Sequence, residues 1–154
     1  MKHSARKATA LSINALITQR LFAAPLLSGQ YEFERNEENT VIKVSISKDF
    51  GRFPGGRVPN DGPHNGETFR KEHLVPALKK AMSQNEHVEV SLDDVEGYGS
   101  SFLEEAFGGL IREENFTNDQ LQRHLKIHSR SASMNFYRKM ILDYIKDAIA
   151  AKGD

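Results

Sequence analysis

The chain has 154 residues, of which 38% are hydrophobic and 27% are charged, a composition typical of one ordinary soluble domain with a sizeable core. Its 21 Lys and Arg balance its 21 Asp and Glu, so it lacks the basic excess of general nucleic-acid or anionic-membrane binders. The absence of cysteine excludes disulfides, thiol catalysis and cysteine-ligated zinc, and it fits a reducing compartment. No cofactor is indicated.

Residues 1–29 are predicted to form an N-terminal helical extension. Polar residues interrupt its apolar stretch, so neither a signal peptide nor a membrane span is expected, and we predict a cytoplasmic protein. The helix either packs on its own domain, binds a partner, or serves as an oligomerisation helix. In the last case the chain would be a homo-oligomer. The apolar residues at near-helical spacing, which Pro25 ends, are Leu11, Ala15, Leu16, Ile17 and Leu21.

Residues 30–154 are predicted to form one α/β domain. A β-hairpin over 30–35 and 40–47 precedes a loop over 51–66 that is rich in Gly and Pro. A helix over 67–83 follows, with an interruption near His73 because Pro76 lies within it.

The second half of the domain continues this alternation of strands and helices. The pattern predicts a buried strand at 87–92, a helix at 101–112, a short helix from 118, a strand at 125–128 and a tail helix at 133–151. Together these elements favour a two-layer fold, with helices packed on a mixed sheet of four to five strands.

A serine pair at the start of the 101–112 helix is the first candidate site. Ser101 followed three residues later by Glu104 is typical of a capping box. Alternatively, Ser100 or Ser101 accepts a phosphoryl group or contacts an anion, because the positive end of a helix stabilises negative charge. Glu104 and Glu105 would repel a phosphate, so phosphorylation would then loosen the helix start or repel a partner.

Two glycines lie in the middle of the same helix. Gly108 and Gly109 each cost about 1 kcal/mol there relative to alanine, so a compensating role is expected. Either a neighbouring segment of the domain approaches closely, or the glycines form a smooth surface on which a partner sits.

The Gly- and Pro-rich loop is the second candidate site. Glycines let backbone N–H groups approach a phosphate and arginines clamp it, so contact with a nucleotide or a phosphopeptide is one interpretation. The loop has neither a Walker nor a dinucleotide-binding motif. Surface ion pairs that merely hold the loop are an equal alternative. The residues concerned are Arg52, Arg57, Asp61, His64, Glu67 and Arg70.

No catalytic or metal site is predicted. His124 and His128 have the spacing of two ligands on a helix, but an extended chain over 125–128 would hold their imidazoles about 13 Å apart. No Ser-His-Asp order, paired catalytic carboxylates or HExxH motif indicates a hydrolase.

Four runs of the sequence carry a resemblance to a known family. They are Phe50–Arg57, Asp61–Gly62, Asn65–Arg70 and, most specifically, Gly99–Leu110. Over roughly residues 41 to 129 the chain resembles the bacterial STAS-like domain family of unknown function. That family is similar to STAS domains, best known as anti-sigma-factor antagonists, in which a kinase phosphorylates the second serine of an Asp-Ser-Ser-Gly motif.

The resemblance implies a small, non-enzymatic regulatory module that binds a protein partner, such as a histidine-kinase-like ATPase. Ser101 would be the phosphorylated serine, although Gly99 and Phe102 stand where the antagonists have Asp and Gly. The alternative function is a nucleotide- or phosphate-ligand-binding domain, or an enzyme, that uses loop 51–70. The expected partner- or ligand-binding residues are Arg52, Arg57, Asp61, Glu67, Arg70, Glu104, Glu105, Gly108 and Gly109.

Overall fold

A computed structural model of the chain describes residues 33–36 and 39–153, with side chains from residue 40 onward. The predicted N-terminal helix lies outside these residues, so its existence and its role stay predictions.

A single sheet with the strand order β1-β2-β3-β4 organises the fold. Strands β2 (Asn39–Ser45), β3 (His87–Ser91) and β4 (Leu125–His128) run parallel, and β1 (Phe33–Asn36) pairs antiparallel with β2. The predicted α/β class is therefore confirmed, with helices and a three-stranded parallel sheet. Strand β3 lies between two neighbours, as its alternation of buried valines predicts.

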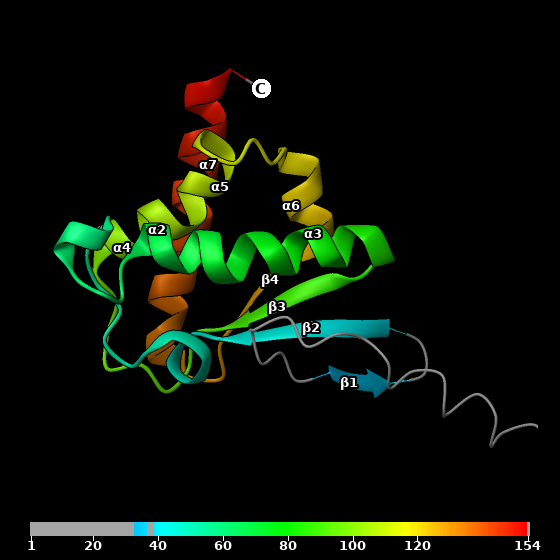
Figure 1. The fold of residues 1–154 in the computed structure, drawn as a ribbon, viewed down its shortest axis with the longest axis horizontal. Coiled ribbons are helices and arrows are strands. Elements are labelled where there is room, and N and C mark those ends of the chain that lie inside the picture. The colour runs from blue at the N-terminus through cyan, green and yellow to red at the C-terminus, as the bar shows by residue number, and fades with distance from the viewer. Residues whose placement is uncertain (1–32, 37–38, 154) are drawn as a thin grey trace, which may run out of the picture.

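The alternation of side chains gives the sheet one apolar and one polar face. Two apolar rows cross the sheet in register, namely Ile42–Val88–Leu125 and Val44–Val90–Ile127. The opposite face carries charged residues such as Lys43, Glu89 and Lys126. The helices shield the apolar face from water (Figure 1).

Strand β2 is shorter than the sequence predicts. The expected strand reaches residue 47, whereas the chain turns into a π-helical turn, Ile46–Phe50, directly after Ser45. The Asp49 carboxylate accepts a hydrogen bond from the Ser45 N–H at 2.7 Å, and the Gly51 N–H donates to the Ile46 carbonyl at 2.8 Å. These local bonds satisfy the backbone in place of a sheet ladder.

The first long helical run consists of α2 (Gly66–Phe69), a π-helical turn (Arg70–Leu74) and α3 (Val75–Gln84). The π-helical turn is the interruption predicted near His73. It ends just before Pro76, whose missing N–H is tolerated in the first turn of α3.

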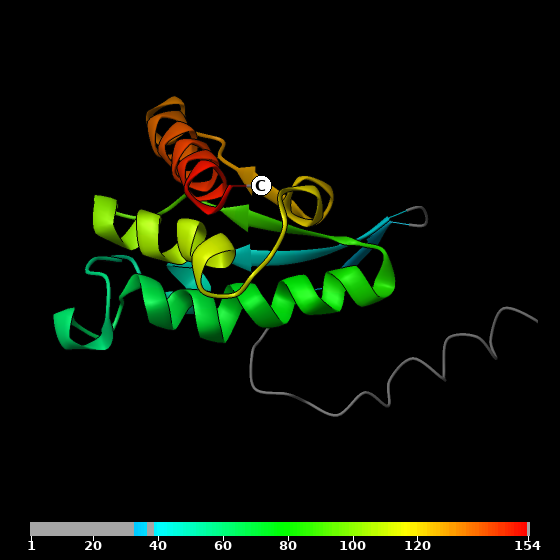
Figure 2. The ribbon, with the colours of Figure 1, turned by 90° about the horizontal axis from the view of Figure 1, so that it is seen from above.

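The second helical run, residues 100–112, consists of α4 (Ser100–Leu103), a π-helical turn (Glu104–Gly108) and α5 (Gly109–Arg112). It packs against the C-terminal helix α7 (Asn135–Lys152), as Figure 2 shows. A shorter helix, α6 (Asn118–His124), leads into β4. These helices are confirmed, with bounds within a few residues of the predicted ones.

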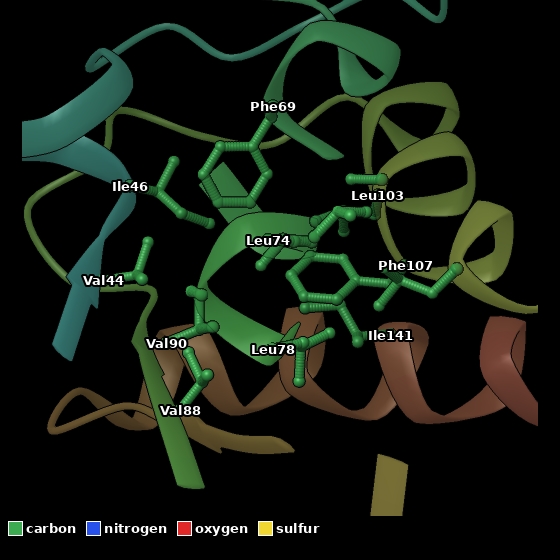
Figure 3. Packing of buried hydrophobic residues seen from close by; sticks show 14 of the residues in the cluster. Val44, Ile46, Phe69, Leu74, Leu78, Val88, Val90, Leu103, Phe107 and Ile141 are labelled. Carbon is green, nitrogen blue, oxygen red and sulfur yellow. The ribbon is translucent and has the colours of Figure 1, made fainter. Parts of the chain in front are cut away.

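The core fills the space between the sheet and the helices. Phe69, Leu78 and Phe107 from the two helical runs are fully buried and meet Val90 of β3 and Ile141 of α7 (Figure 3). Close packing of this kind is what fixes the position of each helix relative to the sheet.

One large apolar residue of the tail helix lies outside the core. The apolar residues of the tail helix, Phe136 among them, predict one buried stripe, but the side chain of Phe136 is 67% exposed. At 3.6 residues per turn, Phe136 lies about 140° around the helix from Ile141, which faces the core. The ring of Phe136 packs instead on Tyr137 beside it, with 5.6 Å between the ring centroids.

Candidate functional site

The Gly- and Pro-rich loop, residues 51–66, is a folded element held by its own hydrogen bonds. The Gly55 N–H donates to the His64 carbonyl at 2.9 Å. The Asp61 carboxylate accepts from the N–H groups of Val58, at 3.1 Å, and of Arg57, at 2.7 Å. These two bonds lower the pKa of Asp61. Asp61 therefore helps to fix the conformation of the loop backbone.

The loop lies against the segment that leads into α4. The Glu96 N–H donates to the Arg52 carbonyl at 3.0 Å, and the Gly99 N–H lies 3.4 Å from the Pro54 carbonyl. The side chains of Arg52 and Glu96 also form an ion pair. A Cβ at position 99 would lie 3.5 Å from the Cα of Gly55, so the two backbones touch. The two sites predicted separately from the sequence thus form one continuous surface.

The serine pair lies in the first turn of α4. Ser100 is exposed and Ser101 is half-buried. The predicted capping box is wrong, because the N-cap is Gly99 and no side chain caps the helix. The Glu104 carboxylate, which in a capping box would bond to the N-cap backbone, pairs with Arg57 and Arg112 instead. Within the described residues neither serine hydroxyl has a hydrogen-bond partner.

A buried arginine braces the helical runs beneath this surface. Arg70 is 2% exposed, and its Nη1 donates to the Glu105 carbonyl at 2.6 Å and to the Glu105 carboxylate. Its Nε donates to Glu114 at 3.1 Å. Burial alone would lower the pKa of Arg70, but the bonds to Glu105 and Glu114 outweigh it and raise this pKa. For Glu105 the opposing effects of burial and of Arg70 leave a lowered carboxyl pKa.

Two further arginines neutralise the acidic pair of this helix. Arg57 pairs with Glu104 and lies 3.2 Å from a carboxylate oxygen of Glu105, and Arg112 makes the same two contacts from the other side. The hydrogen bond to Glu104 is the main cause of a raised pKa for Arg57. The repulsion of an anion that the sequence predicts from Glu104 and Glu105 is therefore offset by bound guanidinium groups.

The mid-helix glycines lie where neighbouring groups approach closely. A Cβ at position 109 would lie 2.9 Å from the Cζ of Arg70, and one at position 108 would lie 3.4 Å from the Tyr144 carbonyl oxygen. Both glycines are buried. This arrangement favours the packing explanation of Gly108 and Gly109 over contact with a partner.

Glu67 and His64 have local contacts of their own. Glu67 pairs with Lys71 at 2.5 Å, one helical turn away. The His64 ring packs edge-on against Phe50, with 5.3 Å between the centroids. Arg57, Arg70 and Glu105 thus belong to one ion-pair network, whereas Glu67 and His64 lie outside it.

Sequence reasoning did not predict that two aromatic residues, Phe53 and Phe136, are exposed. Phe53 is 72% exposed and lies between Arg52 and Pro54, which contact the segment leading into α4. Phe136 is exposed at the start of α7, next to Tyr137, whose ring packs on Tyr98 with 5.1 Å between the centroids. A phenylalanine inside a Gly- and Pro-rich loop, outside any apolar periodicity, was the available signal for Phe53.

The comparison with known families supports the resemblance. Residues 65–133 match the family described as a STAS-like domain of unknown function, a stretch that runs from the start of α2 to the turn before α7. No curated protein and no solved structure matches the chain. Among the helices of residues 33–36 and 39–153, none has the length and apolar character needed to cross a bilayer.

Proposed function

We propose that this chain, whose residues 65–133 match a STAS-like domain, is a non-enzymatic regulatory module that binds a protein partner. Its docking surface consists of Arg52, Phe53, Ser100, Ser101 and Phe136. A STAS-like domain of unknown function fits a regulatory interaction module, and the proposal adds the place where the partner binds.

The exposed Phe53 carries this proposal. Interfaces draw most of their affinity from a few large side chains that become buried on binding, and aromatic residues are enriched among them. Phe53 is presented by a loop that its own hydrogen bonds already hold in place. Binding through such a loop costs little conformational entropy, because the backbone is ordered before the partner arrives.

We further propose that a partner kinase of the histidine-kinase-like ATPase type phosphorylates Ser101. The γ-phosphoryl group of ATP would pass to the Ser101 hydroxyl oxygen, which releases ADP and the hydroxyl proton. Arg57 is held by Glu104, one turn beyond Ser101. A phosphate on Ser101 would compete with Glu104 for Arg57 and so change the charge that the docking surface presents.

The alternative, a nucleotide or phosphate site in loop 51–70, has less support. Arg70 is buried in its ion pairs, Arg57 is held by two carboxylates, and Asp61 accepts bonds from the loop backbone. A phosphate clamp would have to break these interactions before it could bind. A nucleotide panel read by thermal shift tests this alternative, since a ligand of the folded state raises its apparent stability.

Site-specific photo-crosslinking in cells tests the docking surface. Phe53 is replaced in the full chain by the photoreactive amino acid benzoylphenylalanine, and in a matched control the exposed Gln84, at the far end of α3 from the loop (Figure 1), is replaced in the same way. The proposal predicts a discrete covalent adduct with one protein from position 53 and none from position 84. Equal adducts from both positions, or none from position 53, would contradict it.

A further inference from the structure

A groove of about 700 Å³ lies between β4, α6 and α7. Figures 1 and 2 show the two helices on either side of β4, which is the last strand of the sheet. The volume of the groove is within the range of known binding pockets. The groove shares no residue with the docking surface. Its apolar lining comes from all three elements and includes Leu121, Leu125, Ile127, Leu142, Ile145 and Ile149.

The apolar lining is partly open to solvent. Leu142 is 47% exposed, whereas most large apolar side chains in the described chain are buried. At the open edge of β4, the Ile127 carbonyl already accepts a hydrogen bond from Arg138 Nε at 3.1 Å. A ligand therefore gains more from burying its side chains against the helices than from adding a strand to this edge.

The charges around the groove are mostly positive. Lys126, Arg138 and Lys146 line it, and within the described residues none of them pairs with a carboxylate. Glu89 is the acidic member of the lining, and its carboxylate lies 3.7 Å from His128. The groove therefore presents unpaired cations next to exposed apolar surface.

We infer that this groove binds a short amphipathic segment of a partner protein, with an apolar face flanked by Asp or Glu. The apolar side chains would cover Leu142 and its neighbours, and the carboxylates would meet the unpaired cations. The N-terminal segment of this chain has the wrong charge for the role. Residues 1–29 contain no Asp or Glu, and their basic residues are Lys2, Arg6, Lys7 and Arg20.

Selection of displayed random peptides on the immobilised full chain tests this inference. The enriched peptides are expected to combine Leu, Ile or Phe with Asp or Glu. Their affinity should fall by about tenfold or more in the Lys126→Glu/Lys146→Glu variant, because two attractive contacts become repulsive. The Lys79→Glu/Lys139→Glu variant makes the same change of net charge at exposed positions outside the groove, and it should bind the peptides as the unmodified chain does.

Several results would overturn the inference. Enrichment of basic or uncharged peptides would do so, as would peptides that both charge variants bind equally well, or a selection that enriches no peptide. Analytical ultracentrifugation of the full chain adds a separate readout. A dimer that Leu142→Asp converts to monomer would assign the groove to a second copy of the chain instead of an acidic partner.

Discussion

Arg70 is a charged residue almost completely removed from water. Removing a guanidinium from water is costly, and the cost is offset only when its donors and its charge find partners. Glu105 supplies a carboxylate and a carbonyl, and Glu114 supplies a second carboxylate. Glu105 belongs to the α4–α5 run, and Glu114 follows the end of that run. Arg70 therefore ties the α2–α3 run to the α4–α5 run.

Glu105→Gln should destabilise the fold by about 3 kcal/mol, because it leaves the buried charge of Arg70 without its main partner. Glu67→Gln is the matched control. It removes the more exposed pair with Lys71, and should cost about 0.5 kcal/mol. Chemical denaturation of both variants at neutral pH measures the difference. Similar losses of unfolding free energy would show that Arg70 does not depend on Glu105.

The same carboxylate should make the fold sensitive to acid. The pKa of Glu105 is lower in the folded chain than the ordinary 4.5 that applies when the chain is unfolded. Its stabilisation is therefore present above about pH 4.5 and is lost as the pH falls toward the folded pKa. Melting curves from pH 7 to pH 3 should show a smaller loss for Glu105→Gln than for the unmodified chain. Parallel losses would exclude Glu105 as a source of acid sensitivity.

Ser101→Ala should change the unfolding free energy by less than about 0.5 kcal/mol, because the Ser101 hydroxyl caps nothing. Thr117→Ala is the control at a true N-cap. Thr117 accepts from the Gln120 N–H at 3.2 Å, and its loss should cost about 1 kcal/mol. The denaturation midpoints of the two variants test whether the Ser101 hydroxyl caps the helix. A Ser101→Ala loss as large as that of Thr117→Ala would restore the capping explanation.

The error at Ser101 shows what local sequence patterns miss. A serine and a glutamate three residues apart indicate a capping box when local bonds decide the conformation. Here Glu104 is drawn to Arg57 and Arg112, and the helix begins one residue earlier than predicted. Arg57 is 47 residues away in sequence, and no local pattern reports such a pairing.

At the scale of elements, Gly109→Ala should destabilise the fold by about 1–3 kcal/mol, since its Cβ would displace the buried guanidinium of Arg70. Gly55→Ala is the matched control, because a Cβ there would meet no atom within 4 Å. It should leave stability unchanged or raise it slightly, by restricting the unfolded chain. Thermal melts of both variants test this contrast. A Gly109→Ala protein as stable as the unmodified chain would show that Arg70 can move aside.

The elements that could be predicted are those whose periodicity agrees with their final packing. Strand β4 has the predicted bounds, and the helical runs follow from the spacing of Phe69, Leu78 and Phe107. The π-helical turn after Ser45 could not be predicted, because Ile46 also fits a strand. Contact between loop 51–66 and the start of α4 depends on the tertiary fold, so the sequence predicted two sites where the structure has one surface.

At the scale of the whole molecule, the proposed function would separate the residues that stabilise the fold from those that bind a partner. The buried core fills the space between the sheet and the helices, and the Arg70 network joins the two helical runs. The proposed docking surface lies where loop 51–66 contacts the segment that leads into α4, and where Tyr98 of that segment packs on Tyr137 of α7. A partner bound there would contact segments on both sides of β3 in the sequence, so its binding would report on the intact fold.

The affinity of the partner captured at position 53 for purified full-length variants tests the proposed function most directly. Phe53→Ala should weaken binding by about tenfold or more while the melting temperature stays unchanged, because an exposed side chain contributes little to folding. Ser101→Asp should also alter the affinity, whereas Ser83→Asp, with the same charge change at the end of α3, should not. Equal affinity of the unmodified chain and Phe53→Ala would contradict the proposed docking surface.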